Sequence, residues 1–187
     1  LFIMRELDHR VKNMLAIILS VARLTAKHDT SLPGFLKQFT NRVQAMARTH
    51  ALLSESRWRG LTLHALLEDE LAQYRNADED NLFLSGPAVT LPPAAGQSLS
   101  MALHELATNA AKYGALSRPE GRLYVRWSHR GADGASTLRI DWREAGGPEV
   151  TQPSREGFGT TVLNKILTSQ LHADVSQRFE ADGLQVR

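Results

Sequence analysis

Apolar residues recur at three- and four-residue intervals through the first third of the chain, the spacing of one face of an α-helix. The first stripe is Leu7, Val11, Met14, Ile18 and Val21, and the second is Phe35, Phe39, Val43, Met46, His50 and Leu53. Residues 27–34 break the pattern, with Asp29, Thr30 and Ser31 as cap candidates and Pro33 near a first turn. Two helices joined by so short a turn run antiparallel, which predicts a helical hairpin with apolar surface left for a partner.

From residue 61 the pattern changes to short strands mixed with helices. We expect helices over residues 64–74, 92–113 and 160–171, and strands over residues 61–63, 82–84, 89–91, 122–128, 137–143, 173–179 and 184–187. Ser85, Gly86 and Pro87 between two of these strands predict a small hairpin, and Gly114 occupies the usual position after a helix end. Residues 145–159 are rich in Gly and Pro, which predicts irregular structure.

These elements predict an α+β protein with two domains. Residues 1–58 form an antiparallel helical hairpin, half of a four-helix bundle, and residues 59–187 form a layer of helices on one face of a sheet. The chain begins at Leu1 rather than Met and stops within an expected strand, so we interpret it as a piece of a longer protein.

Composition narrows the class of protein. The chain has no Cys, which excludes a disulfide scaffold, a Cys-based zinc site and a cysteine nucleophile, and fits a reducing cytosol. The longest aliphatic run, residues 14–19, is far shorter than the roughly twenty residues of a transmembrane helix. We therefore predict a cytoplasmic fragment without membrane insertion.

Charge is divided unevenly between the two parts. Residues 1–60 hold ten Lys and Arg against four Asp and Glu, and residues 61–187 hold twelve against sixteen. A basic first third can attract nucleic acid, nucleotide phosphates or an acidic protein, or it can be a solvated face of long side chains. The basic residues are dispersed and lack interleaved aromatic residues, which argues against nucleic acid.

The helix expected over residues 92–113 carries the most informative polar pattern. Its core face would hold Leu99, Leu103, Leu106, Ala110 and Tyr113. Glu105, Asn109 and Lys112 stand at i, i+4 and i+7 on a neighbouring face. Carboxylate and amide oxygens suit Mg²⁺ and an ammonium suits phosphate, although a solvated helix face with a Glu–Lys pair has the same pattern.

Two glycine-containing stretches follow this helix. The first is Asp141-Trp-Arg-Glu-Ala-Gly-Gly-Pro148, and the second is Gly157-Phe-Gly-Thr160 at the start of a helix, where backbone amides favour phosphate. Their order after the polar helix resembles the Bergerat-type ATP site of the superfamily that includes histidine kinases, gyrase and MutL.

A closer resemblance rests on three motifs over nearly the whole chain. They are Leu7-Asp-His-Arg-Val-Lys-Asn13, the His104 that precedes the asparagine motif, and Trp142-x-Glu144 with the residues that follow it through Pro153 and Gly157-Phe-Gly-Thr160. Together they resemble the HWE histidine kinases, which are bacterial two-component sensor kinases. The resemblance implies a Bergerat-type α/β sandwich that uses ATP and Mg²⁺.

The resemblance also implies a role for each matching residue. His9 is similar to the phosphoacceptor, and its position opposite the apolar stripe predicts an exposed ring. Asp8 is the nearest carboxylate that could orient this ring or take its proton. Glu105 could orient the nucleophile, accept its proton or help Asn109 hold Mg²⁺. The nucleotide-binding residues implied are Asn109, Lys112, Tyr113, Glu144, Gly146, Gly157, Gly159 and Thr160.

Within that set, Lys112 is implied in phosphate contact, Tyr113 in closing over the nucleotide and Glu144 in accepting the adenine amino group. Gly146 leaves room for the base, and residues 147–156 resemble a short ATP lid. Trp142 is expected in the core or the pocket wall. His104 is characteristic of the family, and the sequence leaves its role open between structure and phosphate contact.

The function implied is autophosphorylation of His9 followed by transfer of the phosphoryl group to an Asp of a response-regulator receiver domain. A homodimer through the hairpin is expected, with a monomer as the alternative, and a sensor domain is expected upstream in the same chain. Two other functions fit the same residues less well, namely a catalytically silent ATP-binding scaffold and a Bergerat-fold ATPase with Glu105 as base.

Overall fold

The computed structural model describes residues 2–28, 31–77, 80–132, 135–149, 159, 167–180 and 182–187. The helical elements are α1 (Phe2–His28), α2 (Leu32–Glu55), α3 (Leu63–Leu71), η1 (Ala72–Tyr74), α4 (Pro93–Lys112), η2 (Ala115–Ser117) and α6 (Thr168–Leu171). The strands are β1 (Leu61–Thr62), β2 (Leu82–Ser85), β3 (Thr90–Leu91), β4 (Arg122–Ala132), β5 (Ala135–Ala145), β6 (Gln177–Glu180) and β7 (Gly183–Val186).

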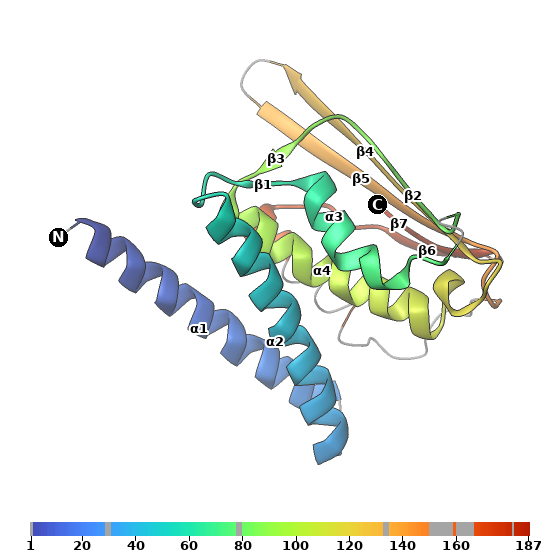
Figure 1. Cartoon of the computed structure of the whole chain (residues 1–187), viewed down its shortest axis with the longest axis horizontal. Helices are drawn as coiled ribbons and strands as arrows, with labels where there is room; N and C mark the ends of the chain where they lie inside the picture. The colour runs from blue at the N-terminus through green and yellow to red at the C-terminus, as the bar shows by residue number, and fades with distance from the viewer. Residues whose placement is uncertain are drawn as a thin grey trace.

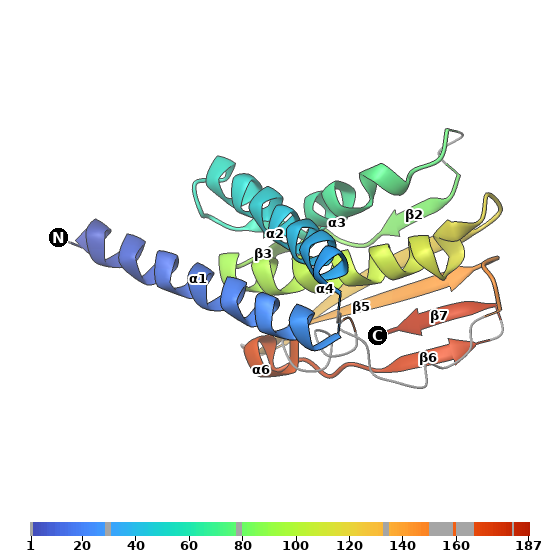
Figure 2. The same cartoon turned by 90° about the horizontal axis from the view of Figure 1, so that it is seen from below.

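Helices α1 and α2 form the expected hairpin. Ser31 caps α2, since its hydroxyl accepts a hydrogen bond from the Gly34 N–H at 3.1 Å, and a proline lies in the first turn. The two helices diverge from their shared turn, so that the N-terminal half of α1 lies apart from the other elements in both views (Figures 1 and 2). Among the described side chains of the hairpin, the exposed large apolar ones are Val11, Leu15, Leu19, Leu32 and Leu36.

The rest of the described chain is a sheet with helices on one face (Figure 1). Five strands lie in the order β2-β4-β5-β7-β6, with β2 parallel to β4 and the other pairs antiparallel. Leucines of α3 and α4 pack on Leu123, Val125 and Trp142 of the sheet. Helix α2 packs on α4, so the hairpin and the helical layer are in contact. The mixed α+β architecture expected from the sequence is therefore confirmed.

The hairpin expected over residues 82–91 is wrong. Strand β2 joins the five-stranded sheet beside β4, whereas β3 pairs with β1 in a separate two-stranded sheet. The segment between them is held by Trp127, whose indole N–H donates to the Pro87 carbonyl at 2.7 Å. A side chain at Gly86 would overlap the Trp127 ring, so this glycine permits a close approach to the sheet and not a tight reversal.

The C-terminal elements match the expectation in part. Strand β6 begins at Gln177 and not at residue 173, while β7 lies where a strand was expected. The helix predicted over residues 160–171 appears as α6 at its end, and its first seven residues lie outside the described residues.

Candidate functional site

Helix α4 carries the polar residues Glu105, Asn109 and Lys112, and each of them is more exposed to solvent than the one before it. Pro92 and Pro93 open the helix as expected, because the first turn of a helix does not need their missing N–H groups. Glu105 is 6% exposed, Asn109 is half-buried and Lys112 is exposed. Glu105 is therefore not part of a solvated helix face.

The core face of α4 is as expected except at its end. Leu99, Leu103, Leu106 and Ala110 are buried, but Tyr113 is 71% exposed, so its placement in the core is wrong. The last helical residue is Lys112, and Tyr113 leaves helical geometry at φ −131° and ψ −18°. The change in backbone direction turns the ring away from the apolar face.

The carboxylate of Glu105 is bound by an arginine of the hairpin. Arg42 Nε lies 2.7 Å from Glu105 Oε1, and Arg42 Nη2 lies 3.1 Å from Oε2, so both oxygens accept from one guanidinium. Arg42 Nη1 donates to the Thr25 hydroxyl at 3.1 Å, and that hydroxyl donates to the Val21 carbonyl at 2.6 Å. One buried side chain thus links α1, α2 and α4.

Gly159 lies against the middle of this polar strip. A Cβ built on Gly159 would be 3.0 Å from Asn109 Nδ2 and 3.5 Å from Glu105 Cβ. The structure therefore brings together Glu105, Asn109 and Gly159, three of the residues that the sequence selects. Gly157 and Thr160 lie outside the described residues, as does most of the expected lid over residues 147–156.

Glu144 lies at the end of β5 on the face covered by the helices. Its side chain is 2% exposed, and its two oxygens accept from the Ala115 N–H at 2.9 Å and from the Trp142 indole N–H at 3.1 Å. Burial raises the pKa of Glu144, and these two hydrogen bonds lower it in part. Trp142 is 2% exposed, and its ring packs in the core while its indole N–H binds this carboxylate.

Two glycines fit the chain around Glu144. A side chain at Gly114 would overlap Glu144 Oε2, and Gly114 has an extended backbone instead of the left-handed conformation usual after a helix end. Gly114 follows the end of α4 as expected, and close approach to Glu144 explains the glycine. Gly146 has a φ of +72°, where glycine is favoured, and lies beside the Glu120 carbonyl.

His104 faces α3 and not the Glu105–Asn109 strip. His104 Nδ1 lies 3.2 Å from Glu70 Oε2, and the same oxygen is 3.3 Å from Arg48 Nη2 of α2. Glu70 is fully buried, and its other oxygen, Oε1, has no hydrogen-bond partner among the described residues. Arg48 also pairs with Asp69 at 3.3 Å. A second contact thus joins α2 to the helical layer.

The donor set on α4 fits Mg²⁺ only in part. No group of three or more His, Asp or Glu side chains suitable for a metal occurs in the part of the chain that the structure describes. Mg²⁺ needs few protein ligands, because substrate phosphates and water complete its shell, so the Asn109 oxygen is suitable. Glu105 is not suitable while Arg42 occupies both of its oxygens.

Comparison with known proteins identifies the group to which this chain is related. Residues 6–88 match a sequence model described as HWE histidine kinase. Blue-light-activated histidine kinases from Brucella ovis and Brucella anthropi are 34% and 35% identical to it over 182 residues, which is 97% of this chain and 37% of each relative. The segment over residues 6–88 belongs to the HWE histidine kinase family. The chain spans just over a third of the length of these relatives.

Two solved structures share the fold of this chain. The Erythrobacter litoralis EL346 blue-light activated histidine kinase superposes with a TM-score of 0.66 at 20% identity, covering 97% of this chain and 56% of that one. Its separate histidine kinase domain gives 0.65 at 18% identity, covering 97% and 87%. At this identity the likeness concerns the fold alone.

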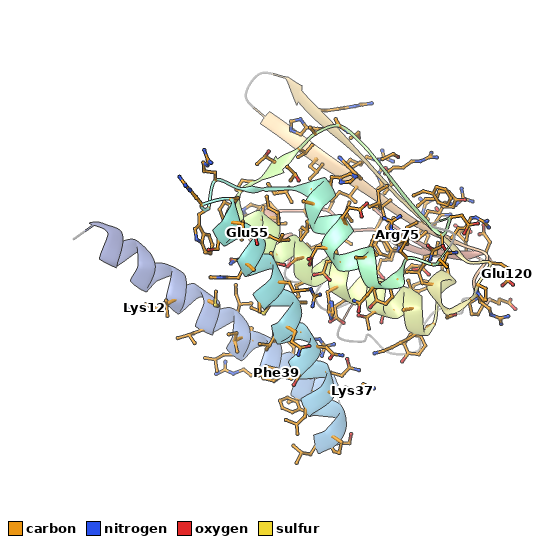
Figure 3. The ribbon with its side chains drawn as sticks, in the orientation of Figure 1. Lys12, Lys37, Phe39, Glu55, Arg75 and Glu120 are labelled. Atoms are coloured by element: carbon orange, nitrogen blue, oxygen red, sulfur yellow. The ribbon has the colours of Figure 1, made fainter. Side chains whose placement is uncertain are left out.

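The two candidate residues nearest the start of the chain, Asp8 and His9, lie on α1. Both residues fall within the helix, but their side chains lie outside the described part of the chain. The exposed His9 ring therefore stays a prediction. The labelled Lys12, one turn after His9, lies on the projecting half of α1 (Figure 3). Sixteen residues separate His9 from Thr25, or roughly 24 Å along a helix axis.

Arg42, Glu70 and Thr25 are the residues that reading the sequence missed. The stripe chosen on α2 is mostly half-buried, and the deepest face of this helix is Arg42, Ala45, Thr49 and Leu53. These four residues are spaced by three and four positions and two of them are small, a pattern that could have indicated a closely packed helix face. Spacing alone does not predict that the arginine within it is buried, because burial of a charge needs a partner, and this partner is distant in sequence.

No helix among the described residues is long and apolar enough to cross a bilayer.

Proposed function

We propose that the chain is the core of a two-component sensor histidine kinase, with residues 1–58 as the phosphoacceptor and dimerisation unit and residues 59–187 as the ATP-binding unit. The observation that carries this proposal is the meeting of Glu105, Asn109 and Gly159 at one site, in an HWE chain whose first helix bears His9. The left-handed backbone at Arg57 and Trp58, after the end of α2, supports a boundary there.

ATP is the substrate and Mg²⁺ its companion ion in this proposal. Asn109 would ligate Mg²⁺, Lys112 and the Gly157–Gly159 turn with Thr160 would contact phosphates, and Glu144 with Gly146 would lie at the adenine end. Mg²⁺, when bound, neutralises charge on the phosphates. Tyr113 would close over the nucleotide, and its exposure at the end of α4 supports this role.

The reaction transfers the γ-phosphoryl group to an imidazole nitrogen of His9. A bond forms between that nitrogen and the γ-phosphorus, the bond to the bridging oxygen breaks, and ADP leaves with that oxygen. The attacking nitrogen is the unprotonated one of the neutral ring, and the proton on the other ring nitrogen passes to a carboxylate, for which Asp8 and Glu105 are the candidates. Positioning and charge neutralisation supply most of the acceleration in such transfers.

A response-regulator receiver domain is the proposed second substrate. Its aspartate would accept the phosphoryl group from His9, with cleavage of the phosphorus–nitrogen bond. The basic first third of the chain, with ten Lys and Arg against four Asp and Glu, suits an acidic partner. A homodimer through the hairpin and an upstream sensor domain belong to the same proposal.

Incubation with γ-labelled ATP and Mg²⁺ tests the proposal. Wild-type protein should gain acid-labile, base-stable label, while His9→Gln and Asn109→Asp should gain none. The His129→Gln variant, altered on the exposed part of β4, is the matched control and should be labelled like wild type. Label on His9→Gln would contradict the assignment of the acceptor, and release of free phosphate without protein label would indicate an ATPase instead.

A further inference from the structure

The contact between the hairpin and α4 is built around Arg42, a buried arginine. Its guanidinium donates to both oxygens of Glu105 and to the Thr25 hydroxyl, at 2.7, 3.1 and 3.1 Å. The side chains of Arg42 and Glu105 are each 7% exposed. This geometry uses both carboxylate oxygens, which is the strongest pairing that an arginine makes with a carboxylate.

A second ionic contact repeats this pairing further along α2. Arg48 reaches the buried Glu70 at 3.3 Å, and Glu70 also contacts His104, the residue next to Glu105 on α4. Two arginines of the phosphoacceptor hairpin therefore bind two buried carboxylates of the helical layer. Adjacent residues of α4 take part in both contacts, so the hairpin is fixed to the helix that carries the proposed nucleotide site.

Basic residues of α2 also act on Lys112, which lies after Glu105 on the same face of α4. Partial burial lowers the pKa of Lys112, the Glu105 carboxylate opposes this, and Arg42 and Lys37 lower the pKa further. Figure 3 labels Lys37 near the start of α2. The electrostatic field of α2 thus reaches both Glu105 and the lysine proposed to bind phosphate.

The docked arrangement keeps His9 far from Glu105. Arg42 joins Glu105 to Thr25 on α1, and His9 lies sixteen residues earlier on that continuous helix, roughly 24 Å along its axis. The half of α1 that carries His9 points away from α4 in both views (Figures 1 and 2). A terminal phosphate held beside Asn109 is out of reach of this histidine while the hairpin stays docked.

We infer that Arg42 holds the kinase in an inactive arrangement, in which it ties the hairpin to α4 and occupies Glu105, and that phosphorylation of His9 by the ATP-binding unit of the same chain requires this contact to open. The inference rests on the proposed function. An unpaired buried carboxylate is costly, so Glu105 loses Arg42 only when the interface opens and water enters. Docked and open arrangements are then two discrete states, and an upstream domain can select between them.

Distance measurement tests the docking contact without relying on activity. Because the chain has no Cys, Ser20→Cys on α1 and Ser128→Cys on β4, both exposed, give two unique positions for spin labels. We expect one distance in the otherwise wild-type protein and a second, longer population when Arg42→Met is added. Methionine keeps the aliphatic bulk of arginine but cannot pair with Glu105. In this variant the docked state contains an unpaired buried carboxylate, whereas water hydrates Glu105 in the open state, so the open state is favoured. An unchanged distance distribution would overturn the inference.

Autophosphorylation rates test the inhibitory role. Arg42→Met should raise the initial rate at saturating ATP and Mg²⁺ by at least threefold, and Thr25→Val, which removes the hydroxyl that Arg42 contacts, should raise it less. The matched control is Arg23→Met, since Arg23 is exposed on α1 and makes no ion pair among the described residues. This variant should change neither rate nor distance. A lower rate in Arg42→Met together with a longer distance would overturn the inhibitory role and make Arg42 a residue that supports catalysis.

The two readouts separate failure of this inference from failure of the proposed function. If wild type is labelled at His9 and Arg42→Met changes neither distance nor rate, the function stands and the inhibitory contact is wrong. If no variant takes up phosphate while Arg42→Met still lengthens the distance, the proposed function fails, and the inhibitory role fails with it.

Discussion

Three buried carboxylates of this chain are stabilised in three different ways. Glu105 has a bidentate arginine, Glu70 shares one oxygen between Arg48 and His104, and Glu144 has two uncharged donors. An uncharged donor compensates a buried negative charge less than a guanidinium does, because it carries no opposite charge. Burial accordingly raises the pKa of Glu144.

The raised pKa of Glu144 predicts a pH dependence of stability. The native state keeps the proton of Glu144 at pH values where the unfolded chain has lost it, so unfolding releases a proton. The free energy of unfolding should therefore fall as pH rises from the ordinary pKa of 4.5 through the raised native value. Urea unfolding from pH 4 to pH 8 measures this slope.

Glu144→Gln is the comparison for that slope, because it cannot titrate. The slope that belongs to Glu144 should be absent in this variant, whatever the variant's absolute stability. Absolute stability should be lower, since the Gln amide presents a donor where Trp142 or Ala115 also donates. Equal slopes in the two proteins would contradict the prediction.

At the scale of the elements, the segment from β2 to β3 shows how a tertiary contact overrides a turn signal. Ser85-Gly86-Pro87 between two apolar runs predicts a hairpin, yet β2 pairs with β4 and β3 pairs with β1. The deciding contact is with Trp127, about forty residues later in the chain, which binds the Pro87 carbonyl and packs on Gly86. A local pattern carries no information about that partner.

Gly86→Ala should disturb this connection. Its Cβ would overlap the Trp127 ring, a rigid group packed in the core, so we expect a loss of about 1–3 kcal/mol in the free energy of unfolding. Gly96→Ala is the matched control, because its Cβ would lie 3.8 Å from Leu61, an ordinary contact. It should be neutral or stabilising by up to about 1 kcal/mol in helix α4. Urea unfolding measures the free energy of unfolding of both variants. Equal values would show that the Trp127 ring moves aside without loss of stability.

Elements with strong periodicity could be predicted from the sequence. The hairpin helices, α4 and the pair β4 and β5 follow from apolar spacing, and Glu105, Asn109 and Gly159 do lie together as their order suggests. The partners of buried charges could not be predicted. Arg42 and Glu105 are 63 residues apart, and only the packing of α2 on α4 makes them neighbours.

At the scale of the whole molecule, the hairpin has two unlike faces. One face of α2 docks on α4 through Arg42 and Arg48, while α1 keeps an apolar stripe in solvent. Val11, Leu15 and Leu19 are 55%, 54% and 57% exposed and lie four residues apart, on one side of the helix. A stripe of this kind suits association with a second hairpin, which would bury it in a four-helix bundle.

Charges placed on this stripe should dissociate the proposed homodimer. Leu15→Glu with Leu19→Glu would require two carboxylates to be buried in the dimer, whereas both stay hydrated in the monomer. Sedimentation should show a concentration-dependent dimer for wild type and a monomer for the double variant, with unchanged helical circular dichroism. Ser20→Glu, exposed on the opposite side of α1, is the matched control and should remain dimeric. A wild type that stays monomeric at all concentrations would exclude the homodimer, and a double variant that still dimerises would place the subunit contact elsewhere.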